Sequence, residues 1–261
     1  MKSFNYKSAT NTKDAAKLVS GRSTFLAGGM SLLPAIKLRL AGYSDLIDIK
    51  KIKSLSGIKV SSKSIKIGAT TTHAEVASSK EVGKSISSLA ILADGIGDPQ
   101  VRNRGTIGGS IANNDPAADY PSACLALNAT IHTSKRKIPA DKFFKGIFET
   151  DLKKGELIEA VEFEVPEKSS YAKFPNPASR YAIVGVYVAK LKTGVRVAVT
   201  GVESCVFRCK KLEDALSSNF STSAIDSINI SSKGFNADIH ASAEYRAHII
   251  KVMAKKAISS C

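Results

Sequence analysis

The first 165 residues alternate between short hydrophobic runs and longer segments whose apolar residues recur three or four positions apart. The short runs predict β-strands at residues 4–6, 25–27, 46–49, 58–60, 65–67, 129–133 and 157–165. The longer periodic segments predict helices at residues 14–19, 32–40, 72–78, 85–95 and 117–127. Strands that alternate with helices in this way indicate an α/β region.

A different pattern follows residue 165. Two strand-like runs, 181–191 and 195–202, flank the turn Lys192-Thr193-Gly194 and predict a hairpin of a small antiparallel sheet. Two further segments, 212–217 and 241–259, predict helices, and P-E-K-S-S at 166–170 predicts a linker. A chain of 261 residues is long enough for two domains. We expect an α/β domain at residues 1–165, with lobes at about 1–55 and 56–165, and an α+β domain at residues 166–261.

A glycine pair lies in the stretch T-I-G-G-S-I-A-N-N-D-P-A-A-D, which runs from Thr106 to Asp119. Gly108 and Gly109 have no side chains, so their backbone N–H groups can approach a bulky anion. The hydroxyl groups of Thr106 and Ser110 flank the pair. A helix that begins after such a turn adds partial positive charge, so the stretch predicts a phosphate site.

The same design occurs earlier in the chain. The strand-like run 25–27 ends at Gly28 and Gly29, after which Ser31 can cap a helix and Pro34 falls in its first turn. Leu32, Leu33, Ile36 and Leu40 would then share one helix face.

Two glycine loops of this kind indicate one elongated phosphate ligand, such as the pyrophosphate of a dinucleotide. Each backbone N–H bonded to a charged oxygen contributes about 1.5–3 kcal/mol, so neither motif needs a lysine. Neither loop matches G-x-G-x-x-G or G-x-x-x-x-G-K-[ST], which argues against a Rossmann domain and a P-loop. The alternative is that both glycine pairs form purely structural turns.

Three motifs together resemble the FAD-binding medium subunit of the molybdenum hydroxylases. They are A-G-G-M-S-L-L-P at residues 27–34, I-G-D-P-Q-V-R-N-R-G-T-I-G-G-S at 96–110 and D-P-A-A-D at 115–119. The likeness continues through I-G-A-T-T-T-H-A-E-V, K-G-E-L-I-E-A-V and A-D-I-H-A-S-A-E-Y-R-A-H, and so covers nearly the whole chain. The family includes aerobic carbon monoxide dehydrogenases, xanthine dehydrogenases and aldehyde oxidoreductases.

The resemblance implies an FAD-binding domain of the vanillyl-alcohol-oxidase-like (PCMH) type, followed by a C-terminal domain of the carbon monoxide dehydrogenase flavoprotein type. Its two pyrophosphate loops correspond to Ala27, Gly28, Gly29, Met30 and Ser31 and to Thr106, Ile107, Gly108, Gly109 and Ser110.

The resemblance also implies four further contacts with FAD. Asp119 corresponds to an acidic contact with the hydroxylated part of the flavin, and Leu157 to a backbone contact. Lys173 and Tyr181 correspond to residues near the isoalloxazine ring, where a lysine would favour a reduced, anionic flavin by Coulomb attraction. The alternatives are a helix cap for Asp119 and an ordinary surface charge for Lys173.

The implied function is that of an electron-transfer subunit of a multisubunit oxidoreductase. Substrate chemistry would occur at a molybdenum cofactor in a large subunit, and electrons would pass through [2Fe–2S] centres of a small subunit to FAD and on to an external acceptor. We expect a dimer of heterotrimers, with no catalytic acid or base and no metal site in this chain. The alternative is a self-contained flavin-dependent reductase or oxidase of the same fold.

Composition adds the expected setting. Apolar residues make up 43% of the chain, yet no run is long enough for a membrane span and the N-terminus lacks the apolar core of a secretory signal. Four scattered cysteines do not suggest a disulfide framework, which favours a cytoplasmic protein. Cys205 and Cys209 are too few for an iron–sulfur cluster, which needs about four ligands, and the histidines show no metal-binding spacing.

The net charge of +15 requires an explanation of its own. No nucleic-acid-binding motif accompanies the basic residues, and few aromatic residues lie among them. We therefore expect a solvated basic surface or a surface that complements acidic partner subunits, and no nucleic acid.

Overall fold

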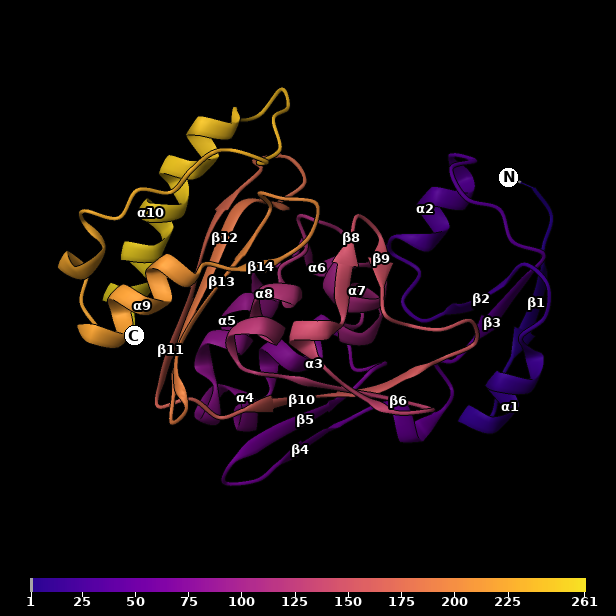
Figure 1. Ribbon diagram of the computed structural model, residues 1–261. Coiled ribbons are helices and arrows are strands. Elements are labelled where there is room, and N and C mark those ends of the chain that lie inside the picture. The colour runs from indigo at the N-terminus through magenta and orange to yellow at the C-terminus, as the bar shows by residue number, and fades with distance from the viewer. Residues whose placement is uncertain (1) are drawn as a thin grey trace.

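The structure, a computed structural model, describes residues 2–261 and consists of β-sheets with helices packed between and against them (Figure 1). At one end lies a parallel three-stranded sheet, here called the first sheet, in the order β1 (Asn5–Ser8), β3 (Asp45–Asp48) and β2 (Ser23–Leu26). Parallel strands need crossover connections, which helices α1 (Thr12–Leu18) and α2 (Leu32–Lys37) supply.

The second sheet is antiparallel and occupies the middle of the molecule. Its strands lie in the order β4 (Ile58–Val60), β5 (Ser64–Gly68), β10 (Ile158–Glu164), β6 (Thr130–Thr133) and β7 (Lys137–Pro139). One face is covered by helices, the bounds of which are α3 (His73–Ser78), α4 (Lys80–Ser85), α5 (Ser87–Asp94), α6 (Pro99–Arg102), α7 (Ile107–Asn113) and α8 (Tyr120–Ala126).

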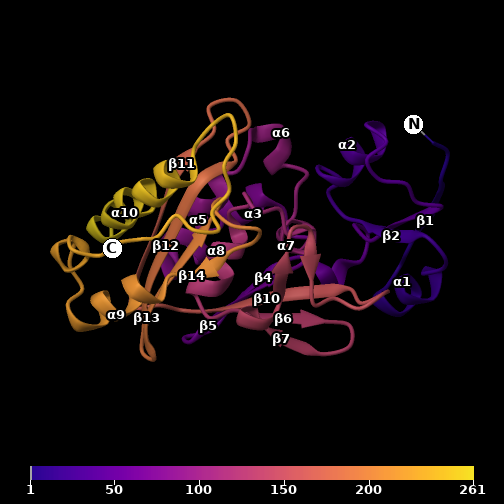
Figure 2. The same ribbon diagram turned by 45° about the horizontal axis from the view of Figure 1, so that its top comes forward.

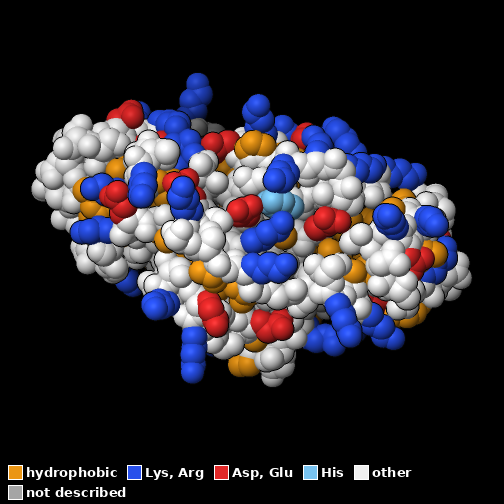
Figure 3. Space-filling view, turned by 90° about the horizontal axis from the view of Figure 1, so that it is seen from below, with side chains coloured by type: hydrophobic (Ala, Val, Ile, Leu, Met, Phe, Trp, Pro, Cys, Tyr) orange, Lys and Arg blue, Asp and Glu red, His pale blue; other side chains and the backbone are white. Residues whose placement is uncertain are grey.

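The other face of the second sheet is polar. The His132 imidazole and the Glu162 carboxylate share a hydrogen bond of 2.7 Å, and the Lys66 ammonium lies 3.4 Å from the same imidazole. Seen from below, Lys and Arg side chains are spread over the molecule among fewer acidic groups (Figure 3). The excess of basic residues in the sequence is thus displayed on the surface of the molecule.

The third sheet is antiparallel, in the order β11 (Lys168–Pro175), β12 (Ala182–Leu191), β13 (Gly194–Thr200) and β14 (Phe207–Arg208). Helices α9 (Lys210–Ser218) and α10 (Ala243–Ser259) pack on one face, and α5 and α8 pack on the other (Figure 2). Because both faces are covered, every residue of β12 except Lys190 is buried.

The remaining elements are short. Strands β8 (Phe144–Gly146) and β9 (Glu149–Thr150) form a two-stranded sheet beside α7. Single-turn 3₁₀ helices occur at η1 (Lys53–Leu55), η2 (Ala140–Lys142) and η3 (Ser223–Ile225). None of the helices in residues 2–261 is long and apolar enough to cross a membrane.

The predicted α+β class and the hairpin at Lys192-Thr193-Gly194 are confirmed. The predicted helix 32–40 is too long, because Arg39 adopts the left-handed region with φ of 63° and α2 ends at Lys37. Leu40 is consequently 80% exposed and does not share the buried face. The predicted linker 166–170 is also partly wrong, since β11 begins at Lys168.

Helix α7 is the most consequential element that the pattern analysis missed. Gly108 and Gly109 were expected in a turn before a helix, but they lie in the first turn of α7, for which Thr106 is the N-cap. Glycine lowers helix propensity by about 1 kcal/mol, so residues 107–113 contain little local indication of a helix. The packing described below explains why glycine is nevertheless present.

Candidate functional site

The first glycine motif forms an open loop between β2 and α2. Gly29 adopts the left-handed region with φ of 77°, and Ser31 occupies the N-cap position of α2 without a side-chain cap. Within residues 2–261, the backbone N–H groups of Gly28, Gly29, Met30 and Ser31 donate to no protein acceptor. Successive unpaired N–H groups around a left-handed residue form a concave site for an anion. This loop therefore fits a phosphate ligand.

The second glycine motif has its N–H groups already paired within the protein. Ile107 donates to the Thr71 carbonyl at 3.1 Å, Gly108 to the Ala69 carbonyl at 2.9 Å and Gly109 to the Thr106 hydroxyl at 3.2 Å. A Cβ at position 108 would lie 2.5 Å from the Ala69 Cβ. Gly108 is thus present because α7 packs directly against the segment after β5, which differs from the anion-approach role expected for it.

The two motifs face each other although they are far apart in the sequence. A Cβ on Gly28 would lie 2.7 Å from the Arg104 carbonyl carbon and 2.9 Å from the Gly105 Cα. A Cβ on Gly109 would lie 3.9 Å from the Ala27 Cβ. Glycine at position 28 thus permits backbone-to-backbone contact between the first motif and residues 104–105, which immediately precede the second motif. The unpaired N–H groups of the first motif lie where this contact is made.

Asp119 lies beneath the third sheet and is only 4% exposed. Its carboxylate accepts a hydrogen bond from the Tyr171 hydroxyl, and its ion pair with the Lys173 ammonium measures 3.1 Å. Burial raises the pKa of the Asp119 carboxyl, which the Lys173 charge and the two hydrogen bonds offset in part. Asp119 occupies the N-cap position of α8 but makes no side-chain cap. In this structure its contacts are with other protein side chains.

Three cations contact the carbonyl groups of the segment between α5 and α6. Lys173 donates to the Gly95 carbonyl at 2.7 Å, and Arg102 donates to the Ile96 carbonyl at 3.1 Å. Arg180, itself in the left-handed region with φ of 61°, donates to the Gly97 carbonyl at 3.3 Å. Lys173 and Arg180 come from the chain around the third sheet, so these bonds join it to the helices over the second sheet.

Tyr181 and Ser31 bring the first motif next to the third sheet. Tyr181 is 43% exposed as a residue, and burial raises the pKa of its phenol while the neighbouring Ser31 hydroxyl partly offsets that rise. Met30 is 38% exposed beside Ser31. The structure thus brings the first motif, the second motif and Tyr181 to one region.

Leu157 is held by two backbone contacts with Ser134. Its N–H donates to the Ser134 hydroxyl at 3.2 Å, and its carbonyl accepts from the Ser134 N–H at 2.8 Å. Its buried side chain packs with Ile47 and Ile49 in the core under the first sheet. Leu157 is predicted to contact FAD through its backbone, yet its N–H and carbonyl groups are both already hydrogen-bonded to Ser134.

Glu156, next to Leu157, gives the chain a pH-sensitive contact. Burial opposes ionisation, but hydrogen bonds from Arg136, the Lys153 N–H and Thr133 outweigh it and lower the pKa of Glu156 from 4.5 to about 2. Because the folded-state pKa is the lower one, ionised Glu156 stabilises the fold above pH 4.5, and this stabilisation is lost as the pH falls towards 2.

We therefore predict that Glu156→Gln lowers the free energy of unfolding at neutral pH by about 1.5–3 kcal/mol, the usual value of hydrogen bonds to a charged group. The difference from the natural chain should shrink as the pH falls below 4.5. Urea unfolding at a series of pH values measures both. A difference that stayed constant down to pH 2 would contradict this role for Glu156.

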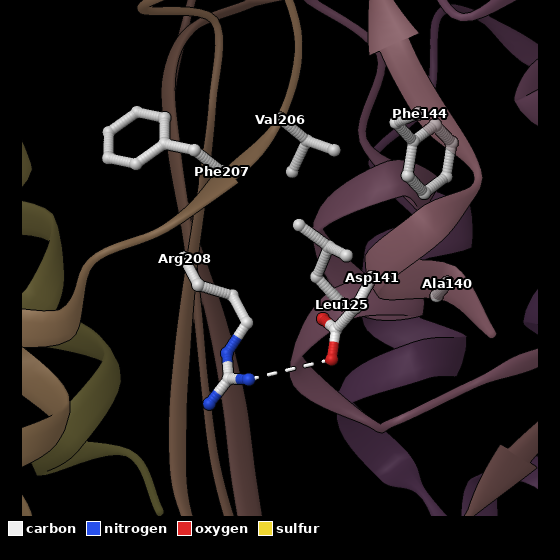
Figure 4. A pocket seen from close by; sticks show the side chains of 7 residues that line it. All are labelled: Leu125, Ala140, Asp141, Phe144, Val206, Phe207 and Arg208. Atoms are coloured by element: carbon white, nitrogen blue, oxygen red, sulfur yellow. Dashed lines mark ion pairs between the residues drawn. The ribbon is translucent and has the colours of Figure 1, made fainter. Parts of the chain in front are cut away.

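Two cavities lie apart from the glycine motifs. One, of about 180 Å³, lies where the third sheet meets η2 and β8, and its lining includes the Arg208–Asp141 ion pair of 3.5 Å (Figure 4). The other, of about 450 Å³, lies among α3, α5 and α6. None of the residues that line either cavity is a predicted cofactor contact.

Comparison with known proteins decides the family. Residues 2–167 match the family described as the FAD binding domain in molybdopterin dehydrogenase. The chain belongs to this family. It is an FAD-binding medium subunit of the molybdenum hydroxylase type and thus an oxidoreductase subunit, as the sequence motifs predicted.

Relatives support this over most of the chain. The chain is 36% identical to the glyceraldehyde dehydrogenase medium chain of Sulfolobus acidocaldarius, with 97% of this chain and 96% of that protein covered. It is also 36% identical to the carbon monoxide dehydrogenase medium chain of Hydrogenophaga pseudoflava, with 78% and 77% covered. These relatives are medium chains of multisubunit enzymes.

Solved structures agree in fold. The chain superposes on reconstituted CO dehydrogenase from Oligotropha carboxidovorans with a TM-score of 0.91 and 27% identity, covering 99% of this chain and 97% of that one. It superposes on quinoline 2-oxidoreductase from Pseudomonas putida 86 with a TM-score of 0.89 and 26% identity, covering 100% and 98%. The arrangement of the sheets is therefore that of the medium subunit in such enzymes.

The residues present fit an FAD molecule. The unpaired N–H groups at residues 28–31 suit a diphosphate. Exposed Tyr181 lies beside Ser31 of this loop, and the Lys173 ammonium contacts the segment 95–97. Within residues 2–261, no group of three or more His, Cys, Asp or Glu side chains has the geometry of a metal site. This FAD-binding subunit thus offers cofactor-binding groups without a metal cluster among its described residues.

Sequence reasoning missed Tyr171, Arg102 and Arg180, which contact Asp119 or the segment 95–97. Tyr171 and Arg180 act through partners far away in the chain, since Tyr171 is 52 positions from Asp119 and Arg180 is 83 positions from Gly97, whereas Arg102 bonds to Ile96 only six positions away. The one available signal was that the motif I-G-D-P-Q-V-R-N-R-G begins with a glycine-containing segment before Arg102. That motif does not reveal which carbonyl groups receive the cations.

Proposed function

We propose that this chain binds FAD between its two glycine motifs and the third sheet, and that it carries electrons from [2Fe–2S] centres of a partner subunit to an external acceptor. The observation that supports the proposal best is the row of unpaired N–H groups at residues 28–31, in a loop that packs at Gly28 against residues 104–105 just before the second motif. FAD supplies the capacity to accept and pass on one or two electrons when it is bound. The chain supplies its binding site and its electrostatic surroundings.

Each candidate contact has a distinct role in this proposal. The backbone of Ala27, Gly28, Gly29, Met30 and Ser31 binds the diphosphate by its N–H groups. The residues of the second motif, Thr106, Ile107, Gly108, Gly109 and Ser110, form the opposite wall, where the half-buried Ser110 hydroxyl is the available side-chain donor.

The flavin end of the site lies near the third sheet in this proposal. Tyr181 offers an exposed aromatic face, and Lys173 offers a positive charge that favours the reduced flavin. Asp119 acts on the cofactor indirectly, through its ion pair with Lys173. Leu157 also acts indirectly, through the core that supports the first sheet.

We further propose that residues 1–165 form the FAD-binding domain, with lobes at about 1–55 and 56–165, and that residues 166–261 form the C-terminal domain. The family match that ends at residue 167 supports this boundary. The partners would be a large molybdopterin-binding subunit and a small [2Fe–2S] subunit in a cytoplasmic dimer of heterotrimers. The relatives named as medium chains support the presence of larger and smaller partner subunits.

The decisive experiment is anaerobic reduction of the FAD-loaded chain by its partner. We expect the purified chain to bind FAD, to oxidise no substrate by itself, and to lose its oxidised-flavin absorbance when the chemically reduced [2Fe–2S] subunit is added. Absorbance spectra recorded before and after mixing provide the measurement.

Two other outcomes have clear meanings. A chain that failed to bind FAD would remove the basis of the proposal. A chain that bound FAD and turned over an aldehyde or an N-heterocycle without partners would be a self-contained flavoenzyme. Native mass spectrometry of the reconstituted complex tests the dimer of heterotrimers separately.

A further inference from the structure

The Lys173 side chain is unusually constrained for a lysine. It is only 11% exposed, and its ammonium group has three N–H donors. One donor goes to the Gly95 carbonyl at 2.7 Å and another to the Asp119 carboxylate at 3.2 Å. The other Asp119 oxygen lies 3.1 Å from the ammonium, so the carboxylate shares one donor between its two oxygens. No other acceptor residue is recorded among the described residues, which leaves one N–H for an acceptor from outside the chain.

The position of the ammonium depends on where the Asp119 carboxylate lies. Asp119 accepts from both the Lys173 ammonium and the Tyr171 hydroxyl. The Asp119 side chain makes no capping hydrogen bond to the N-terminus of α8 that would fix its direction independently. Two hydrogen-bond donors together orient a buried carboxylate. If one donor is removed, the remaining donor alone determines the orientation of the carboxylate.

Tyr171 is itself fixed by its surroundings. Its ring centroid lies 5.9 Å from that of Tyr187, and a Cβ at position 185 on the paired strand would collide with its hydroxyl group. Tyr171 and Lys173 lie on the same face of β11, two residues apart. These contacts therefore fix the Tyr171 hydroxyl group at a defined position next to the Asp119 carboxylate.

We propose that Tyr171 is a positioning residue of the flavin site, which through Asp119 directs the free N–H of Lys173 towards the bound cofactor. This inference rests on the proposed function and adds a residue to it that the sequence motifs do not indicate. Asp119 serves to orient Lys173 in this arrangement. The segment 95–97 provides the second fixed point, since the Gly95 carbonyl takes the other Lys173 donor.

The test compares the midpoint potential of bound FAD in four proteins, namely the natural chain, Tyr171→Phe, Lys173→Met and the double variant. Without the tyrosine hydroxyl, Asp119 draws the ammonium to itself, so the potential should become more negative in Tyr171→Phe. The dissociation constant for FAD should rise by about twofold to tenfold, as for the loss of one hydrogen bond. In the Lys173→Met background, Tyr171→Phe should change neither quantity.

Tyr187→Phe is the matched control. Tyr187 is fully buried, its hydroxyl lies 2.6 Å from that of Ser88, and its ring lies beside that of the partly buried Tyr171, but no contact with Asp119 is recorded for it. It should destabilise the fold in thermal unfolding without changing the potential. Equal shifts in Tyr171→Phe and Tyr187→Phe, or a Tyr171→Phe shift that persisted without Lys173, would overturn the proposal. Failure of the natural chain to bind FAD would instead refute the proposed function.

Discussion

Replacing Gly28 by alanine is expected to reduce the affinity for FAD by about a hundredfold, equivalent to roughly 3 kcal/mol of binding free energy. The new Cβ would lie 2.7 Å from the Arg104 carbonyl carbon and would overlap its oxygen. Backbone atoms cannot turn aside as a flexible side chain does, so the first motif must move away from the second. The N–H groups at residues 28–31 would then be displaced together with the loop that carries them. Flavin fluorescence titration measures the affinity.

Gly83→Ala is the matched control for this result. A Cβ at Gly83, which lies within α4, would have nothing within 4 Å, so the substitution should leave FAD binding unchanged. It should stabilise the helix by about 1 kcal/mol, because alanine is the better helix former. If Gly28→Ala bound FAD as tightly as Gly83→Ala does, the contact between the two motifs would not matter for the cofactor.

Replacing Asp119 by alanine should lower the free energy of unfolding by about 3–5 kcal/mol, the usual loss when one partner of a buried ion pair is removed. Lys173 would keep its charge at a position that is only 11% exposed, with the Gly95 carbonyl as its one recorded acceptor. The Tyr171 hydroxyl would also lose its partner. Urea unfolding of the cofactor-free chain provides the measurement, which keeps the stability effect separate from FAD binding.

Two further variants make this prediction specific. The double variant Asp119→Ala with Lys173→Met should regain most of the lost stability, because no unpaired charge remains buried. Asp214→Ala, which removes an exposed aspartate of α9, should change stability by less than about 0.5 kcal/mol. A double variant as unstable as Asp119→Ala would show that the carboxylate matters for reasons other than the ion pair.

The two glycine motifs look alike in sequence but differ in what their glycines do. Gly29 gives the first loop its left-handed turn and leaves N–H groups free, whereas Gly108 lets α7 pack on Ala69. Gly28 lets the two motifs touch. A glycine can thus be required for backbone conformation, for helix packing or for loop contact, and these three reasons are indistinguishable in the sequence.

The sequence by itself determined the alternation of strands and helices, the hairpin at residues 192–194, the α+β class and the family. These features depend on local periodicity, turn residues and short motifs, all of which are written in neighbouring positions. Helix α7 escaped detection because its glycines oppose the local preference that periodicity measures.

Only the tertiary structure decided which motif has free N–H groups and which side chains surround Asp119. Tyr171 and Asp119 are 52 residues apart, and Lys173 and Gly95 are 78 apart. Such contacts form only when β11 docks against the helices over the second sheet, so their partners depend on packing across the molecule. Hydrogen-bond pairing of a backbone N–H depends likewise on which distant carbonyl the fold brings within reach.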